Sequence, residues 1–162
     1  MWHKPSSRFQ PSLLDRLLDD SPQVSIEAST ELELDLPRYK ATVARDLEAL
    51  LNARRVDGDA QVEALPLARL SIMSYGICDL SSLSLSDPGA QLQVRAQIKT
   101  AIERHEPRLA RVRVNLEAAR GKERQLRFRV DAVLSVHPQR PPVVFDALLQ
   151  LATSTYRVAE MA

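Results

Sequence analysis

The sequence contains few cysteines, glycines and aromatic residues, and each shortage excludes a class of function. A single cysteine, Cys78, among 162 residues excludes an internal disulfide and a metal site built from several cysteines, and it is typical of a reducing compartment. The four glycines are isolated, so the chain has no glycine-rich phosphate loop. Aromatic residues make up only 4% of the chain. The predicted core is therefore aliphatic.

Neither sign of charge dominates the chain, and it has no long apolar run. The 22 basic and 21 acidic residues give a formal net charge of +1, so no global field favours nucleic acid. No apolar stretch approaches the roughly 18 residues that span a bilayer, and residues 1–10 lack the apolar core of a signal peptide. We therefore expect a cytoplasmic protein that binds no nucleic acid and inserts into no membrane.

The side chains that most often carry chemistry are dispersed along the chain. His3, His105 and His137 form no pair at the spacing of metal ligands. Cys78 lacks the local signature of a nucleophile, and a lone thiol in an irregular segment is usually a packed residue. We therefore predict no metal site, no cofactor site and no catalytic residue.

One enzymatic alternative stays open, a pair of carboxylates. Glycoside hydrolysis needs two carboxyl groups about 5–10 Å apart. Glu103 and Glu106, at a predicted helix end, meet this distance loosely. Carboxylates at such spacing usually lie on a solvated helix face, and the adjacent Arg104 and Arg108 favour their ionised forms. The sequence therefore favours a non-catalytic protein over a hydrolase.

The first 34 residues predict a leader, a short helix and an extended arm. Prolines and serines in residues 1–11 indicate a mobile leader. Leucines recur at helical spacing within residues 12–20, at Leu13, Leu14, Leu17 and Leu18. A helix of about two turns is unstable alone in water. This apolar stripe must therefore dock in a partner's groove or onto its own domain.

Residues 35–162 predict a single domain with two main helices. Asp35 caps the first helix, and its apolar face contains Tyr39, Val43, Leu47, Leu50 and Leu51. Asp87 caps the second helix, which is predicted to end near His105. Between the two helices, residues 61–85 have an irregular pattern and predict a long ordered loop with one short strand or helical turn.

After residue 108 the apolar pattern has a period of two. The alternation in residues 110–116 and 126–136 predicts a hairpin with one apolar face and one basic face, the latter carrying Arg111, Arg113, Arg127 and Arg129. A third run, Val143 to Val158, is mixed in phase. The predicted fold is α+β, a small antiparallel sheet of about three strands with two main helices packed on one face, plus the short N-terminal helix.

Four separated segments resemble one family. They are residues 12–17 (SLLDRL), 46–55 (DLEALLNARR), 71–80 (SIMSYGICDL) and 102–109 (IERHEPRL). In their order and spacing over residues 12–135 they resemble the TssE family, the type VI secretion counterpart of the short wedge protein in contractile-phage baseplates. Cys78 stands where this family pattern has proline, and Ala53 stands where it has threonine. The charged residues of the motifs are kept.

The resemblance implies a non-catalytic structural subunit in the cytoplasm, recruited to the inner membrane through the assembled baseplate. Its implied partners are baseplate proteins of the TssF, TssG and TssK type and contractile sheath subunits, whose assembly it helps to initiate. The implied fold is similar to the strand-exchanging domain of sheath subunits. Because some members are labelled lysozyme-like, a peptidoglycan hydrolase remains the alternative function.

The residues predicted to bind partners are Glu106, Pro107, Arg108, Leu13, Leu14, Leu17, Arg54 and Arg55. Glu106, Pro107 and Arg108 form a helix-to-strand corner that the proline makes rigid, although an internal glutamate–arginine pair would also explain these residues. Arg54 and Arg55 stand at the end of the first main helix, where cations also complement the helix dipole. In addition, we expect an open sheet edge in the run from Val143 to Val158 to accept a strand from a sheath or wedge protein.

Overall fold

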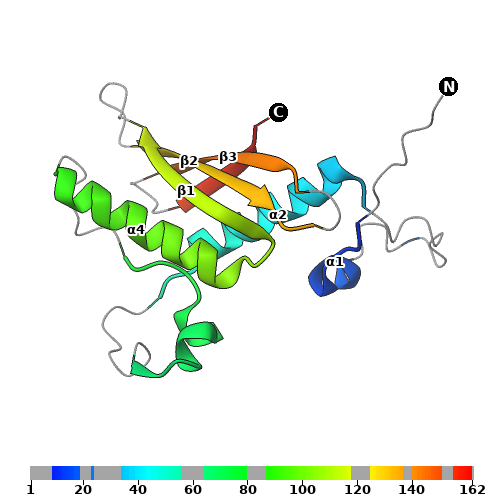
Figure 1. Cartoon of the computed structure of the whole chain (residues 1–162), viewed down its shortest axis with the longest axis horizontal. Helices are drawn as coiled ribbons and strands as arrows, with labels where there is room; N and C mark the ends of the chain where they lie inside the picture. Colours follow the sequence, from blue (N-terminus) through cyan, green and yellow to red (C-terminus); the bar gives the residue numbers. More distant parts are fainter. Residues whose placement is uncertain are drawn as a thin grey trace. The chain divides into compact units, whose positions relative to one another are not determined.

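The computed structural model describes residues 9–18, 23, 34–55, 64–79, 87–117, 125–136, 140–150 and 155–161. These residues form helices, two short 3-10 turns and one sheet (Figure 1). The chain divides into two compact units, residues 1–43 and 44–162. The predicted leader before Phe9 and most of the predicted extended arm lie outside the described residues.

The first unit contains the short helix α1 (Leu13–Leu17). Ser12 caps it through a reciprocal capping box, because Ser12 Oγ accepts a hydrogen bond from Asp15 N (3.2 Å) and Asp15 Oδ2 accepts one from Ser12 N (2.9 Å). No residue of this helix is buried, and Leu13 and Leu17 are 75% and 73% exposed. The predicted helix and its leucine stripe are confirmed, over a shorter range.

Helix α2 (Leu36–Asn52) begins where the sequence predicts it. Asp35 Oδ1 accepts a hydrogen bond from Arg38 N at 3.0 Å, which satisfies one of the free donors of the first turn. The predicted apolar face is confirmed, since the following side chains are buried: Tyr39, Val43, Leu47, Leu50 and Leu51.

Helix α4 (Pro88–His105) likewise follows its local signals. Asp87 Oδ2 accepts a hydrogen bond from Ala90 N at 2.9 Å, and Pro88 takes the first helical position. The buried face contains Ala90, Val94, Ile98, Ala101 and Ile102. The helix ends at His105, as the sequence predicts, and Glu106, the residue before Pro107, is its C-cap.

The sheet has four antiparallel strands in the order β1-β2-β3-β4, so each strand pairs with the next along the chain. They are β1 (Leu109–Glu117), β2 (Gln125–Leu134), β3 (Pro142–Gln150) and β4 (Thr155–Glu160). The predicted hairpin is confirmed as β1 and β2. The third predicted run forms two strands, so the sheet has four strands where about three were expected, and the predicted α+β fold with two main helices is confirmed.

The position of β3 corrects part of the predicted edge, since only the end of that run, Thr155 to Val158 in β4, lies at an edge of the sheet. Strand β3 lies between β2 and β4, and it therefore pairs on both sides. Its interior position explains the mixed phase of the run, because Val144 and Leu148 on the outer face are only partly exposed. The true edges of the sheet are β1 and β4.

A β-bulge interrupts β1. Arg111 and Val112 together oppose a single residue of β2, and Arg111 adopts a left-handed φ of 56°. The predicted alternation is confirmed from Arg111 to Glu117, and the bulge interrupts it only at the start of the strand. Leu109 is buried and Ala110 is not, and the buried positions resume at Val112.

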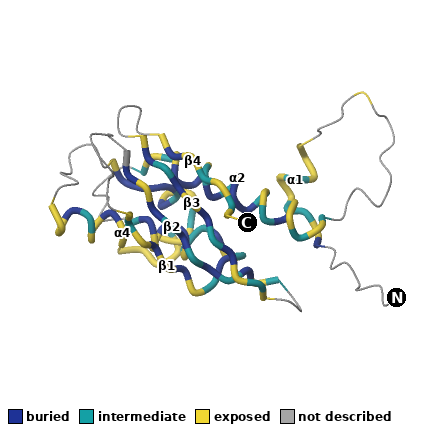
Figure 2. The backbone as a smooth tube through the Cα atoms, turned by 90° about the horizontal axis from the view of Figure 1, so that it is seen from above, coloured by how far each residue is buried: buried dark blue, intermediate teal, exposed yellow. Residues whose placement is uncertain are grey.

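The sheet has a buried face and an outer face, which Figure 2 shows as alternating colours along the strands. Helix α4 and the end of α2 pack against the buried face. The outer face is mixed in charge, unlike the predicted basic face. Arg129 Nε lies 3.6 Å from Asp146 Oδ1, and Asn115 Nδ2 donates to Asp131 Oδ2 at 3.0 Å. Carboxylates of β2 and β3 therefore offset the arginines.

Candidate protein interaction sites

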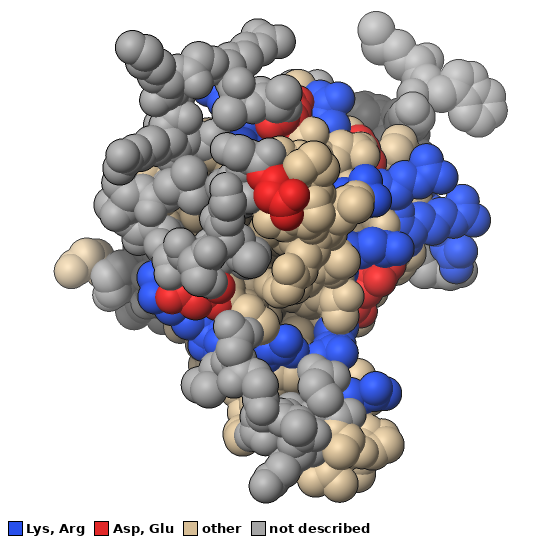
Figure 3. Space-filling view, turned by 90° about the vertical axis from the view of Figure 1, so that its left-hand side faces the viewer, with Lys and Arg blue, Asp and Glu red and all other residues tan. Residues whose placement is uncertain are grey.

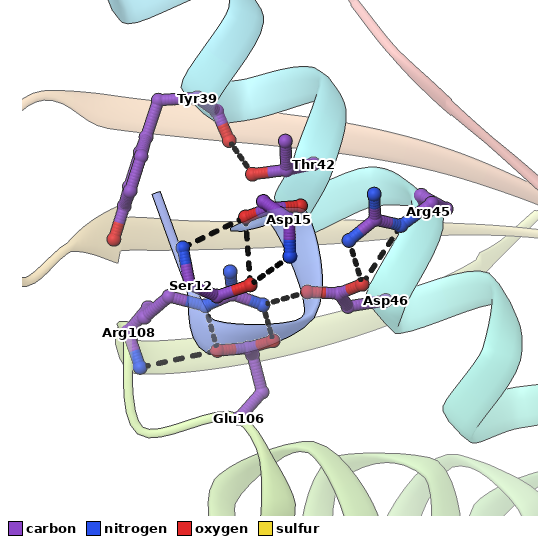
Figure 4. A network of polar contacts seen from close by, with 8 residues as sticks. All are labelled: Ser12, Asp15, Tyr39, Thr42, Arg45, Asp46, Glu106 and Arg108. Atoms are coloured by element: carbon purple, nitrogen blue, oxygen red, sulfur yellow. Dashed lines mark hydrogen bonds and ion pairs between the residues drawn. The ribbon is translucent and has the colours of Figure 1, made fainter. Parts of the chain in front are cut away.

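The corner between α4 and β1 is built around a buried carboxylate. Glu106 is only 4% exposed, and Pro107 follows it at the surface. The carboxylate accepts hydrogen bonds from the backbone N–H of Arg108 (3.2 Å), from its Nε (2.6 Å) and from its Nη2. Nη2 also donates to Asp46 Oδ2 at 2.6 Å (Figure 4). The glutamate–arginine pair is therefore internal.

Opposite charges keep the Arg108 guanidinium ionised in this partly buried place. Burial alone would lower its pKa, but the hydrogen bonds and charge of Glu106, followed by those of Asp46, raise the pKa above the usual value for arginine. One nitrogen, Nη1, is buried and has no hydrogen-bond partner among the described residues. The three side chains form an ionic network that fixes the corner to α2.

The same geometry gives no support to the hydrolase alternative. The Glu106 carboxylate is held by a guanidinium, and Glu103 is half-exposed, with its Oε1 at 3.7 Å from Lys99 Nζ. Each of these carboxylates therefore has a cationic partner within the chain. The arrangement holds a corner in place and does not form an acid–nucleophile pair.

Arg54 and Arg55 lie where α2 meets the segment 76–79. Ile77 N donates to Ala53 O at 3.1 Å, and Arg55 N donates to Ile77 O at 2.9 Å. Gly76 permits this close approach, because its φ is 100° and an added Cβ would lie 2.3 Å from Ala53 O. The two predicted arginines therefore belong to a tight backbone joint.

The side chains of this joint have partners in the same segment. Arg54 Nη1 lies 3.6 Å from Asp79 Oδ2, and Arg55 Nη2 donates to Cys78 Sγ at 3.3 Å. Cys78 is 8% exposed, as expected for a packed thiol. Both arginines thus have structural contacts, and their role in binding partners stays a prediction.

Side chains of α2 cover part of the outer edge of β4. Asn52 Oδ1 accepts a hydrogen bond from Tyr156 N (2.8 Å), and Asn52 Nδ2 donates to Tyr156 O (3.0 Å). Glu48 Oε2 accepts one from Val158 N at 2.8 Å. The side-chain amide of Asn52 thus pairs with both the backbone N–H and the C=O of Tyr156, as a neighbouring strand would. Sequence patterns did not predict these contacts, because the paired residues are more than 100 positions apart.

Tyr156 carries a buried hydroxyl group into the core. The residue is 3% exposed, and its ring meets Phe128 edge-on with the centroids 6.0 Å apart. The hydroxyl has no hydrogen-bond partner among the described residues. Burial raises the pKa of this hydroxyl, and the charge of Asp79 raises it further. The hydroxyl therefore adds no bond to the fold.

The structure brings together only some of the predicted residues. Glu106, Pro107 and Arg108 form one cluster, and Asp46, which joins them to α2, was missed because it is 62 residues away from Arg108. Arg54 and Arg55 occupy the separate joint beside Ile77. The leucines of α1 belong to the first unit.

No metal centre is found in the described part of the chain. Within it, no three His, Cys, Asp or Glu side chains are arranged to hold a metal ion. His105 Nε2 instead lies 2.9 Å from Ser74 O and 3.1 Å from Ser74 Oγ. Across the same residues, no helix has the length and apolar character needed to cross a membrane.

The described residues thus contain an ionic corner at Glu106 and Arg108 and a sheet edge covered by side chains of α2. A family model described as baseplate wedge protein gp25 matches residues 37–139, more than half of the chain. The chain therefore belongs to this family of structural baseplate wedge proteins of contractile injection systems. The matched range includes the whole Asp46–Glu106–Arg108 network. A search of curated proteins found no match.

Proposed function

We propose that the chain is a TssE-type subunit of a type VI secretion baseplate, a cytoplasmic protein without catalytic activity. It joins wedge components of the TssF, TssG and TssK type, reaches the inner membrane as part of the baseplate, and helps to start the contractile sheath. The observation that carries this proposal is the Asp46–Glu106–Arg108 network inside a chain of the baseplate wedge family. The motifs at residues 12–17 and 71–80, which resemble TssE, support the assignment to type VI secretion.

The network supports a scaffolding role because it makes the corner rigid. A surface that is already ordered loses little conformational entropy when a partner binds. Pro107 is exposed at the tip of this corner, between two residues fixed by ion pairing. The proposed partner-binding surface here is therefore Pro107 with the backbone around it, held in shape by Glu106 and Arg108.

The leucine stripe of α1 supports a second contact. Leu13, Leu14 and Leu17 are all more than half exposed on a helix that is capped at Ser12. An amphipathic helix with such a stripe fits an apolar groove of a partner. We assign this role to the three leucines, and the basic joint at Arg54 and Arg55 is the third proposed contact.

The edge of β1 is the proposed site for adding a strand. Leu134 N donates to Pro141 O, so alternate residues of β2, including Asp131 and Arg129, direct their backbone groups toward β1. These two residues pair with Arg113 and Asn115. The backbone N–H and C=O groups of the intervening residues of β1, such as Leu116, therefore point away from the sheet.

The opposite edge is a poorer acceptor, because Asn52 and Glu48 already bind the backbone of β4. A proline at position 116 removes one outward N–H from β1 and leaves the ladder to β2 intact. We expect Leu116→Pro to reduce sheath assembly in cells while leaving the wedge complex unchanged. Leu116→Ala is the matched control, since it removes the same side chain and keeps the N–H. Normal sheath lengths in the folded proline variant would exclude strand addition at this edge.

Expression in cells that lack the natural subunit tests the assignment as a whole. A TssE-type protein restores sheath formation when it is supplied to a type VI system from which its counterpart has been deleted. Fluorescently labelled sheaths provide the readout. If the wild-type chain reaches normal levels and no sheath forms in its own system, the assignment to type VI secretion is wrong.

A further inference from the structure

Five large apolar side chains are exposed to solvent within a short stretch of the second unit. Their exposed fractions are 59% for Leu65, 84% for Leu67, 69% for Leu70, 78% for Ile72 and 60% for Met73. Single exposed apolar residues are common, but a contiguous group of this size marks an interaction surface. We name residues 65–73 the apolar knob.

The backbone of the knob is ordered and is fixed to α4. It consists of two 3-10 turns, η1 (Ala68–Leu70) and η2 (Ile72–Ser74). Ser71 Oγ accepts a hydrogen bond from Met73 N at 3.2 Å and so caps the second turn. Ser74, which is 1% exposed, donates from its Oγ to Arg69 O and contacts His105 Nε2. The exposed side chains are therefore presented on a preorganised support.

The knob carries one charged residue, Arg69, which is exposed. The other residues of the segment 65–73 are uncharged. Figure 3 shows basic side chains beside the tan part of the lobe at the bottom of the view. An occupant with carboxylates around an apolar centre would complement this surface.

We propose that the apolar knob inserts into an apolar groove edged by carboxylates on a neighbouring baseplate protein. A second copy of this chain fits less well, because pairing two knobs would bring Arg69 of one copy close to Arg69 of the other. A lipid surface also fits less well, because the knob lacks the tryptophan, tyrosine or phenylalanine typical of membrane-interface anchors. The inference rests on the proposed function for the identity of the assembly.

The test uses the full chain co-expressed with its TssF, TssG and TssK counterparts. Leu67→Ser combined with Ile72→Ser removes the two most exposed side chains of the knob. Leu92→Ser is the matched control, because Leu92 is an exposed leucine (57%) on α4 outside the knob. We expect the double variant to bind the wedge complex about tenfold more weakly or worse, and the control to bind like wild type. Arg69→Glu should also weaken binding, and high salt should reduce the difference from wild type.

A photo-crosslinking residue at position 67 identifies the occupant. The expected product joins the chain to a segment of a wedge protein that contains both apolar and acidic residues. Crosslinks between two copies of this chain, or binding of the wild type but not the double variant to anionic vesicles, would overturn the proposal. If the folded double variant joins the wedge as well as wild type, only the knob proposal fails. If the wild type itself joins no wedge protein, the proposed function fails with it.

Discussion

Removing the Arg108 side chain should destabilise the protein through the carboxylate that it leaves behind. Glu106 is 4% exposed and accepts three hydrogen bonds from Arg108, two of them from the guanidinium. In Arg108→Ala only the backbone N–H would remain. Breaking a buried ion pair by removing one partner costs about 3–5 kcal/mol. Because the Arg108 side chain is 20% exposed, solvent screening reduces the expected loss to roughly 2–4 kcal/mol.

The expected loss can be measured by urea unfolding and by thermal melting. For a chain of this size, 1 kcal/mol corresponds to about 2–4 °C, so the melting temperature should fall by roughly 5–15 °C. Arg113→Ala is the matched control, since it removes an exposed arginine of β1 and should change stability by less than about 0.5 kcal/mol.

A second variant separates the charge effect from loss of packing. Combining Arg108→Ala with Glu106→Leu removes the unpaired buried carboxylate, and the double variant should recover more than about 1 kcal/mol of the loss. If Arg108→Ala instead unfolds within about 0.5 kcal/mol of wild type, the network does not stabilise the corner. Arg108 would then act mainly at an interface, and the variant should fold normally and fail in assembly.

Three further predictions follow from single features of the fold. Gly76→Ala should lose at least about 3 kcal/mol in urea unfolding, because its φ of 100° and the 2.3 Å approach to Ala53 O leave no room for a Cβ; a loss under about 1 kcal/mol would contradict this. Tyr156→Phe should be neutral or stabilising by about 1 kcal/mol, since the buried hydroxyl has no partner. Because the pKa of Tyr156 is raised in the folded state, its hydroxyl ionises first in the unfolded state as pH rises above the unfolded value of about 10, and the folded protein then loses stability. The phenylalanine variant should lose less stability in alkali, and an unchanged alkaline profile would contradict this. Purified protein should release no muropeptides from peptidoglycan. Release that Glu103→Gln or Glu106→Gln abolishes would support the alternative function as a peptidoglycan hydrolase.

The parts of the fold that depend on local signals were predictable. The beginnings of α2 and α4 follow from Asp35 and Asp87, whose side chains accept hydrogen bonds within the first turn. The number of strands was not predictable in the same way. Residues 151–154 contain neither glycine nor proline, so no turn signal divides β3 from β4. The bulge at Arg111 also escaped prediction, because arginine rarely adopts a positive φ.

The candidate sites show the same division between local and distant information. The motif at residues 102–109 identifies Glu106 and Arg108, and the proline between them predicts a rigid corner. Asp46 completes the network from 62 residues away, and Asn52 reaches Tyr156 across 104 residues. Such pairs depend on how the helices pack on the sheet, which periodicity does not specify. Exposure of the apolar knob is likewise decided by packing, since its residues alone would suit a core.

The most direct test of the central claim is the stoichiometry of the wedge complex. The chain should be co-expressed with its TssF, TssG and TssK counterparts, purified through a tag on one of them, and the intact complex weighed by native mass spectrometry. A structural wedge subunit is recovered in a fixed integral ratio that persists through size-exclusion chromatography. Recovery of the other three proteins as a complete complex without this chain, while the chain remains folded and free, would contradict the account.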